Sequence, residues 1–205
     1  MQMVRGCVDK PVSLAIVILA AGASSRMRGR DKLFEPICSV PILQRLVKLA
    51  QGLGRTYVTL PNPEHPRNEL IENTDATPVF IPNAHEGMSA SIKQACNEIA
   101  QTDAKGMMIV TGDLPELTQH HFQRIAAHWS ENPTTYVQAK DYLGKPGHPV
   151  IIPKTGWTEV QTLQGDHGLR HILPNKNVSY IEFNDLGPTL DLDTPEAWEE
   201  WRKNR

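Results

Sequence analysis

Short apolar runs alternate with amphipathic segments through the first two thirds of the chain, and this order constrains the fold more than any other feature. The first run, LAIVILAAG at 14–22, is continuously apolar and ends in small residues, which is typical of a strand buried on both faces. The other predicted strands lie at 55–61, 77–83 and 106–115, and the predicted helices at 40–54, 89–101 and 117–129. Thr118 is the expected cap of the last of these helices. Such alternation with short connections predicts a mainly parallel sheet covered by helices on both faces.

In the remaining third of the chain, predicted strands and helices alternate less regularly. Two strands are predicted within 134–153, joined by a loop rich in glycine and proline; a short helix at 166–173, a strand at 177–183 and a terminal helix at 194–205 follow. Because no repeat or low-complexity linker interrupts the chain, residues 1–205 are expected to form a single α/β, Rossmann-like domain with a mainly parallel (mixed) sheet. Ligands of such sheets bind beyond the carboxyl ends of the strands, where the site residues are expected.

The balance of charges argues against two classes of partner. With 21 basic and 23 acidic residues the formal net charge is −2, whereas binding to nucleic acid or to an anionic membrane usually goes with a basic excess. Cys7, Cys38 and Cys96 form no CxxC pair, which argues against a disulfide scaffold or a zinc ribbon. Residues 1–10 are too polar for a signal peptide, and no stretch approaches the ~20 apolar residues that cross a bilayer. A cytoplasmic protein is predicted.

The loop after the first predicted strand combines small residues with cations. Ala20, Ala21 and Gly22 allow the backbone to approach a ligand closely, and Arg26 and Lys32 follow soon after. Backbone N–H groups and cations at the end of a strand favour a phosphate site. The loop matches neither the G-x-G-x-x-G pattern nor a Walker loop, and taken alone it is equally compatible with a solvated basic turn.

Two acidic motifs are candidates for a metal site. Asp113 follows an apolar strand and could hold a hard cation such as Mg²⁺, although an aspartate in this position is also a common turn former. In the segment LDLD, Asp191 and Asp193 alternate with leucines, so both carboxylates point the same way if the segment is extended. Their mutual repulsion favours a cation between them. The alternative for Asp193 is to cap the terminal helix, and the two roles are compatible.

Two further segments could contact the substrates. Gly87 and Ser89 lie at the start of the predicted helix, which Ser89 or Ser91 could cap, and they could meet a base or a ribose. His148 lies in the loop rich in glycine and proline, where a second substrate could dock. The alternatives are an ordinary helix start and a rigid turn. His167 and His171 stand four residues apart, but no third zinc ligand is near them in the sequence.

Six motifs in chain order resemble those of the molybdenum cofactor cytidylyltransferases. They are LAAGASSRM with Lys32, GMSASIKQA, TGDLP, GKPGHPVII, GDHGLRHIL and DLDTPEAW, and the resemblance as a whole spans roughly residues 14 to 202. This family is part of the wider group of molybdopterin nucleotidyltransferases and nucleotide-sugar pyrophosphorylases. The resemblance implies the fold of the nucleotide-diphospho-sugar transferase type.

The resemblance also implies roles for the first loop and the acidic motifs. The loop from Leu19 to Gly22, together with Arg26 and Lys32, would bind the triphosphate. Arg26, Lys32 and Asp113 would be the catalytic residues. Asp113 and an aspartate of the DLD motif, Asp193, would hold Mg²⁺, which is the expected cofactor.

The base and the acceptor are implied by other positions. Gly87 and Ser89 would contact the base and the ribose. Alanine at the position of Ala21 goes with CTP in this family, whereas a close guanylyl-transferring relative has glycine there. The pterin acceptor would approach from the side of His148 and Asp166.

The activity implied by the resemblance is transfer of CMP from CTP to the phosphate of molybdenum-molybdopterin, with release of pyrophosphate. Guanylyl or other nucleotidyl transfer to a different phosphorylated acceptor is one alternative. A carrier that binds the molybdenum cofactor without catalysis is another. The expected partners are the two small-molecule substrates and a molybdenum hydroxylase or its chaperone, with neither nucleic acid nor a membrane.

Overall fold

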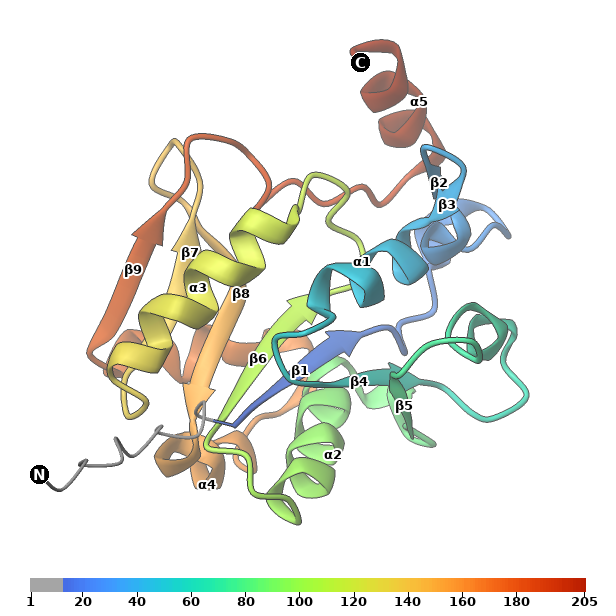
Figure 1. Cartoon of the computed structure of the whole chain (residues 1–205). Helices are drawn as coiled ribbons and strands as arrows, with labels where there is room; N and C mark the ends of the chain where they lie inside the picture. Colours follow the sequence, from blue (N-terminus) through green and yellow to red (C-terminus); the bar gives the residue numbers. More distant parts are fainter. Residues whose placement is uncertain (1–12) are drawn as a thin grey trace, which may run out of the picture.

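A seven-stranded sheet forms the centre of the molecule (Figure 1). The structure is a computed structural model that describes residues 13–205, so the predictions made for residues 1–10 and Cys7 lie outside the described residues. In sheet order the strands are β5 (Thr77–Phe80), β4 (Arg55–Leu60), β1 (Leu14–Leu19), β6 (Gly106–Thr111), β8 (Pro146–Pro153), β7 (Tyr136–Lys140) and β9 (Val178–Glu182). A separate small ribbon consists of β2 (Pro36–Ile37) and β3 (Val40–Pro41).

The predicted parallel part of the sheet is confirmed. Strand β1 runs parallel to both neighbours, with Ile16 opposite Thr56 of β4 and Met108 of β6, and β5 is parallel to β4. Beyond β6 the directions change, because β8 is antiparallel to β6 and β7, whereas β7 and β9 are parallel. The sheet is therefore mixed, and its parallel core brings the carboxyl ends of β1 and β6 to the same edge.

Helices cover both faces of the sheet, as predicted. They are α1 (Ile42–Ala50), α2 (Met88–Ala100), α3 (Gln119–Glu131), α4 (Trp157–Val160) and α5 (Pro195–Lys203). Ile16 and Ile18 of β1 pack with residues of α1 and α3 in one core cluster. Ala15 and Val17 point the other way and pack with residues of α2 and α4. None of the helices within residues 13–205 is long and apolar enough to cross a membrane.

Short 3₁₀ helices shape the connections between these elements. They are η1 (Ser25–Met27), η2 (Lys32–Phe34), η3 (Pro66–Leu70), η4 (Ala84–Glu86), η5 (Lys154–Gly156), η6 (Gly165–His171) and η7 (Leu173–Asn175). Three of them, η1, η2 and η6, contain Arg26, Lys32 and Asp166, which the sequence singled out for a site. Tight single turns of this kind place polar side chains without adding a full helix.

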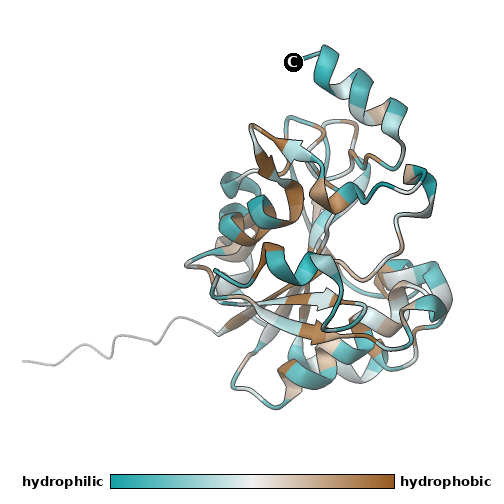
Figure 2. Ribbon diagram, turned by 90° about the vertical axis from the view of Figure 1, so that its right-hand side faces the viewer, coloured by the Kyte–Doolittle hydropathy of each residue, from teal (hydrophilic) through white to brown (hydrophobic). Residues whose placement is uncertain are grey.

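The last helix, α5, stands out from the rest of the ribbon and carries mostly hydrophilic residues (Figure 2). Its inner side buries Trp198 completely, and the indole Nε1 donates a hydrogen bond to the carbonyl of Leu192 at 3.2 Å. On its outer side Glu196 pairs with Arg28 at 2.7 Å. The helix therefore packs back on the segment that precedes it.

The starts of α2 and α3 correct one prediction and confirm another. Helix α2 begins at Met88 with Gly87 as its N-cap, so the prediction that Ser89 or Ser91 caps it is wrong. Gly87 has a φ of 99°, a backbone conformation that glycine adopts far more readily than serine. Thr118 is the N-cap of α3, as predicted, and its N–H donates to Nδ1 of the buried His121 at 3.0 Å.

The close approach of Gly106 to the buried ring of Trp129 gives a test of the core. A Cβ atom on Gly106 would lie 2.3 Å from Cζ2 of that ring. We expect Gly106→Ala to lower the free energy of unfolding by about 1–3 kcal/mol, because overpacking forces shifts of backbone or rotamers. Urea unfolding followed by circular dichroism measures the change.

The matched control removes the atoms that the new methyl group would meet. Trp129→Phe lacks the second ring, so the double variant with Gly106→Ala should lose less stability than the sum of the two single variants. Strictly additive losses would contradict the packing described for this pair.

Candidate active site

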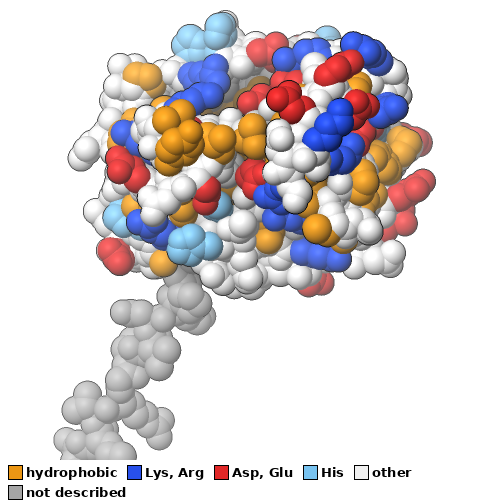
Figure 3. Space-filling view, turned by 90° about the horizontal axis from the view of Figure 1, so that it is seen from above, with side chains coloured by type: hydrophobic (Ala, Val, Ile, Leu, Met, Phe, Trp, Pro, Cys, Tyr) orange, Lys and Arg blue, Asp and Glu red, His pale blue; other side chains and the backbone are white. Residues whose placement is uncertain are grey.

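The carboxyl ends of β1 and β6 open into a cleft of about 850 Å³. Figure 3 shows a hollow on the face seen from above, with acidic and basic side chains gathered beside it. All but one of the residues that the sequence predicted for the site line this cleft: Leu19, Ala20, Ala21, Gly22, Arg26, Lys32, Gly87, Asp113, His148, Asp166 and Asp193. Asp191 lines it as well. The fold thus collects segments that are far apart in the sequence into one cavity.

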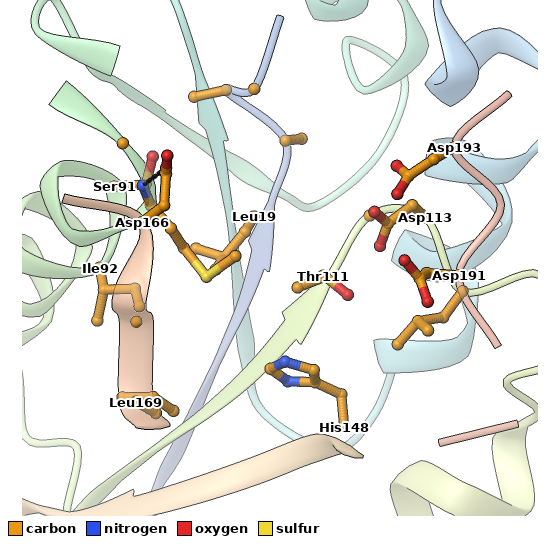
Figure 4. A pocket seen from close by; sticks show the side chains of 18 of the residues that line it. Leu19, Ser91, Ile92, Thr111, Asp113, His148, Asp166, Leu169, Asp191 and Asp193 are labelled. Atoms are coloured by element: carbon orange, nitrogen blue, oxygen red, sulfur yellow. Dashed lines mark hydrogen bonds between the residues drawn. The ribbon is translucent and has the colours of Figure 1, made fainter. Parts of the chain in front are cut away.

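The exception is Ser89. This side chain is buried and does not line the cleft, whereas Ser91, two residues further along α2, does. Successive helical residues are about 100° apart around the axis, so a shift of two positions changes the face of the helix. Figure 4 shows Ser91 close to Asp166 at one end of the cavity. Ser91 therefore takes the position that the sequence assigned to Ser89.

The loop after β1 is fixed through its backbone. The N–H of Ala20 donates to Oγ1 of the fully buried Thr59 on β4 at 2.9 Å. The carbonyls of Ala20 and Gly22 accept hydrogen bonds from one nitrogen of Arg67 at 2.5 and 2.7 Å. Neither partner was identified in the sequence, because Thr59 has the pattern of an ordinary strand residue and Arg67 follows a proline-rich connection. Both lie outside the six motifs.

A lysine lies between two of the predicted carboxylates. Nζ of Lys32 is 2.6 Å from Oδ2 of Asp113 and 2.8 Å from Oδ1 of Asp193. Arg26 pairs with Oδ2 of Asp193 at 2.7 Å. The side chains of Lys32, Asp113 and Asp193 are each less than one fifth exposed, so water screens these contacts less than it would at the surface.

Burial and the neighbouring charges shift the pKa values of these groups in different directions. Burial alone would lower the pKa of Lys32, but the charges of Asp113 and Asp193 raise it above its usual value. Burial would raise the pKa of Asp193, but Lys32 and Arg26 hold it below its usual value. Asp191 pairs with neither cation, and burial together with the charges of Asp113 and Asp193 raises its pKa. The three carboxylates carry more charge than the two cations neutralise.

The carboxylates fit a divalent cation by their chemistry. Oδ1 of Asp113 is buried and has no hydrogen-bond partner in the described part of the chain. A buried carboxylate oxygen without a partner, beside two further carboxylates, is a donor set that Mg²⁺ or Mn²⁺ prefers. As the side chains stand, no three His, Cys, Asp or Glu residues within 13–205 are placed to hold a metal ion together. Lys32 occupies the position between Asp113 and Asp193, so a cation there requires this side chain to move.

The segment that carries Asp191 and Asp193 is held beside Asp113 through the main chain. The N–H of Leu192 donates to the carbonyl of Asp113 at 3.3 Å. Figure 4 shows the carboxylates of Asp191 and Asp193 on either side of Asp113. The residue that caps α5 is Thr194, whose side chain accepts an N–H of the first turn at 3.2 Å. The alternative role of Asp193 as the helix cap is therefore wrong.

The wall of the cleft that η6 and the start of α2 form depends on a glycine. Oδ1 of Asp166 accepts a hydrogen bond from the N–H of Met88 at 3.2 Å, which fixes η6 against the first residue of α2. A Cβ atom on Gly87 would lie 2.5 Å from that same oxygen and 2.6 Å from the carbonyl carbon of Gly165. Gly87 thus permits the close approach of η6 to α2 that forms this wall.

His148 lies in the floor of the cleft, between Thr111 and Leu169 in Figure 4. Its Nδ1 is 3.1 Å from the carbonyl of Ile109, and because a carbonyl only accepts, Nδ1 carries the proton. Burial lowers the pKa of His148, so the ring is neutral near pH 7 and its Nε2 is an acceptor. His167 also lines the cleft and packs edge to face with His171, the ring centroids being 4.4 Å apart.

Comparison with known sequences places this geometry in a family. A model described as MobA-like NTP transferase domain matches residues 16–179. The chain is 27% identical over 199 residues to purine catabolism protein PucB of Bacillus subtilis, covering 91% of this chain and 95% of that protein. It is also 27% identical over 139 residues to a Trichormus variabilis protein named probable molybdenum cofactor guanylyltransferase, covering 67% of this chain and 64% of that protein.

Solved structures agree on the fold. The crystal structure of Rv0371c from Mycobacterium tuberculosis superposes with a TM-score of 0.80 at 22% identity, covering 95% of this chain and 100% of that one. A complex of Rv0371c with manganese gives a TM-score of 0.74 at 21% identity, covering 94% and 100%. The family model spans the first loop, Asp113, His148 and Asp166, which line one cleft. The chain belongs to the MobA-like NTP transferase family and is a nucleotidyltransferase.

Proposed function

We propose that this nucleotidyltransferase, as one domain of residues 1–205, moves CMP from CTP to the phosphate of molybdenum-molybdopterin and releases pyrophosphate. The observation that carries the proposal is the meeting of cations and carboxylates beside the loop at the end of β1. Lys32 and Arg26 contact Asp113 and Asp193 within 2.8 Å, in a cleft that the backbone of Gly22 also lines. A triphosphate needs such cations, and its divalent counterion needs such carboxylates.

Mg²⁺ is the cofactor that we propose, held by Asp113 and Asp193 with Asp191 beside them. Two observations support this choice: Oδ1 of Asp113 is buried without a partner in the described residues, and burial together with the charges of Asp113 and Asp193 raises the pKa of Asp191. When bound, the ion would neutralise charge on the triphosphate and on the transition state. Rv0371c is known in complex with manganese, and Mn²⁺, like Mg²⁺, is a hard cation that prefers oxygen ligands.

The chemistry that these residues assist is a substitution at phosphorus. An oxygen of the acceptor phosphate attacks the α-phosphorus of CTP and forms a new P–O bond. The bond from the α-phosphorus to the bridging oxygen breaks, and pyrophosphate leaves with that oxygen and the electron pair. Such a transfer needs positioning and charge neutralisation more than proton transfer. In this proposal Lys32, once released from Asp113, and Arg26 offset the charge of the leaving pyrophosphate.

The donor base is assigned from the loop and from α2. Gly87 and Ser91 lie in the wall where the base and ribose would bind, with Ser91 in place of the predicted Ser89. Ala21 supports CTP, as the family resemblance implies. The relative from Trichormus variabilis is named for guanylyl transfer, so transfer from GTP is the second candidate within the same mechanism.

The acceptor site is assigned from two other residues that line the cleft, Asp166 beside the start of α2 and His148. Asp166 and the neutral His148 would contact the pterin, with Nε2 of His148 as a hydrogen-bond acceptor. A molybdenum hydroxylase or its chaperone is the partner that we propose for the product. Two alternatives remain, a different phosphorylated acceptor and a carrier without catalysis. Only the carrier predicts pterin binding without pyrophosphate release.

The test is pyrophosphate release from the full chain with molybdenum-loaded pterin, Mg²⁺ and either CTP or GTP. Release with CTP alone would support cytidylyl transfer and the role of Ala21 in base choice. Release with GTP alone would keep the mechanism and overturn the donor. Release only after exchange of the pterin for another phosphorylated acceptor would overturn the acceptor. Tight pterin binding without release would favour the carrier.

The role of Asp113 predicts a loss of turnover. If the metal site contributes ~3 kcal/mol to the transition state, Asp113→Asn should lower kcat by about 100-fold or more at saturating Mg²⁺. Initial rates of pyrophosphate release measure the effect. The control is Asp103→Asn, an exposed aspartate whose side chain accepts a hydrogen bond from Ser13 and lies outside the cleft, which should leave kcat unchanged. A near wild-type rate in Asp113→Asn would remove it from the site.

The bridging position of Lys32 predicts a link between stability and divalent cations. Lys32→Met removes the ammonium group from Asp113 and Asp193 and leaves only the pair of Asp193 with Arg26, which should lower the free energy of unfolding by about 1–3 kcal/mol. Mn²⁺ should raise the Tm of this variant more than that of the wild type, because the ion no longer competes with the ammonium group. Lys48→Met, at an exposed position of α1 without an ion pair in residues 13–205, is the control. If Mn²⁺ raised the Tm of the wild type, Lys32→Met and Lys48→Met equally, this would contradict the idea that the ion and the ammonium group of Lys32 compete for one position.

A further inference from the structure

Arg67 is a buried cation outside every motif that identifies the family. It lies in η3, between β4 and β5, and only 1% of its surface is exposed. Arginine is rarely buried to this extent unless all of its donors are paired, because an unpaired guanidinium would carry a large desolvation cost. The contacts of Arg67 therefore indicate what its burial serves.

All five N–H donors of Arg67 are used within the chain. One terminal nitrogen donates to the carbonyls of Ala20 and Gly22 at 2.5 and 2.7 Å. The other donates to Oγ of Ser24 at 3.0 Å and to Oδ1 of Asp31 at 2.8 Å, and Nε donates to Oδ2 of Asp31 at 2.6 Å. Because no donor is left for a ligand, Arg67 acts on the substrate site only through the residues that it holds.

Asp31 extends this network to the lysine of the site. Its Oδ1 also accepts hydrogen bonds from Oγ of Ser24 at 3.1 Å and from the N–H of Leu33 at 3.0 Å, so that Asp31 caps η2. Burial alone would raise the pKa of Asp31, but Arg67 holds it below its usual value and keeps the carboxylate charged. Lys32, the first residue of η2, directly follows this cap. One guanidinium therefore connects the loop after β1 with the turn that carries Lys32.

We propose that Arg67 is a positioning residue for the nucleotide: with Asp31 it fixes the loop of Ala20–Gly22 and the turn of Lys32 relative to each other before the triphosphate binds. The inference rests on the proposed nucleotide site. A loop that is already ordered loses little conformational entropy when a ligand arrives, so the clamp raises nucleotide affinity without touching the nucleotide. Lysine cannot replace Arg67, because it lacks the planar fork that spans two carbonyls and a carboxylate.

The experiment compares Arg67→Lys and Arg67→Met with the wild type. Binding of CTP and of GTP is measured by calorimetry with Mg²⁺, and amide hydrogen exchange of residues 19–34 is measured by mass spectrometry. We expect nucleotide affinity to fall by about 10-fold or more, and exchange in 19–34 to rise, while the exchange of β7 and β9 and the KM for the acceptor stay within about twofold. Asp31→Asn should give the same pattern and add little to Arg67→Met.

The control is His121→Asn, which disturbs another buried polar residue. His121 bonds to Thr118 and to Asp185 and does not line the cleft. This variant should lower the Tm and leave nucleotide affinity unchanged. If the Arg67 variants lose Tm but bind nucleotide as the wild type does, Arg67 is merely structural and the inference is overturned.

A different result is expected if the nucleotide does not bind at the proposed site at all. In that case neither CTP nor GTP slows amide exchange of residues 19–34 in the wild type, and both the proposed site and the positioning role are overturned. Nucleotide protection in the wild type, together with weakened binding and faster exchange confined to residues 19–34 in Arg67→Lys measured well below its Tm, supports both.

Discussion

The contact of Lys32 with Asp113 and Asp193 is the interaction on which the site depends. It joins residues that are 81 and 161 positions apart in the sequence. Parallel strands with helical crossovers bring the ends of β1 and β6 together, and the backbone bond from Leu192 to Asp113 adds the last acidic segment. Without a cation between them, three carboxylates in a partly buried space would repel one another. In the structure the ammonium group of Lys32 lies between two of them.

This arrangement lets the carboxylates exchange one neutralising cation for another. In the structure Lys32 and Arg26 neutralise two of the three carboxylates, and Asp191 has the raised pKa that marks the remainder. A divalent cation accompanied by a triphosphate would bring both a stronger partner for the carboxylates and a new anion for the freed cations. The same residues could therefore balance charge through one another or through bound substrates, so these ionic contacts need not persist in a complex.

The sequence predicted the strands, the helices on both faces and the edge where the site lies, because these follow from periodicity and from the rules for parallel sheets. It also placed Asp113, Lys32 and Asp193 at one edge. It failed at Ser89, where the cap of α2 is a glycine with positive φ and the helix starts one residue earlier than predicted. It missed Arg67, because burial of this arginine depends on partners at residues 20–31, far from it in the sequence, and leaves no periodic signal.

The terminal helix α5 also helps to fix the acidic DLD segment of the cleft. The indole of Trp198 holds the carbonyl of Leu192, which lies between the two acidic residues of the DLD segment. The position of those carboxylates is thus set from outside the cleft, by a ring that no substrate would touch. Most of α5 faces solvent (Figure 2), whereas the buried side chain of Trp198 is tied to the position of the carboxylates in the cleft.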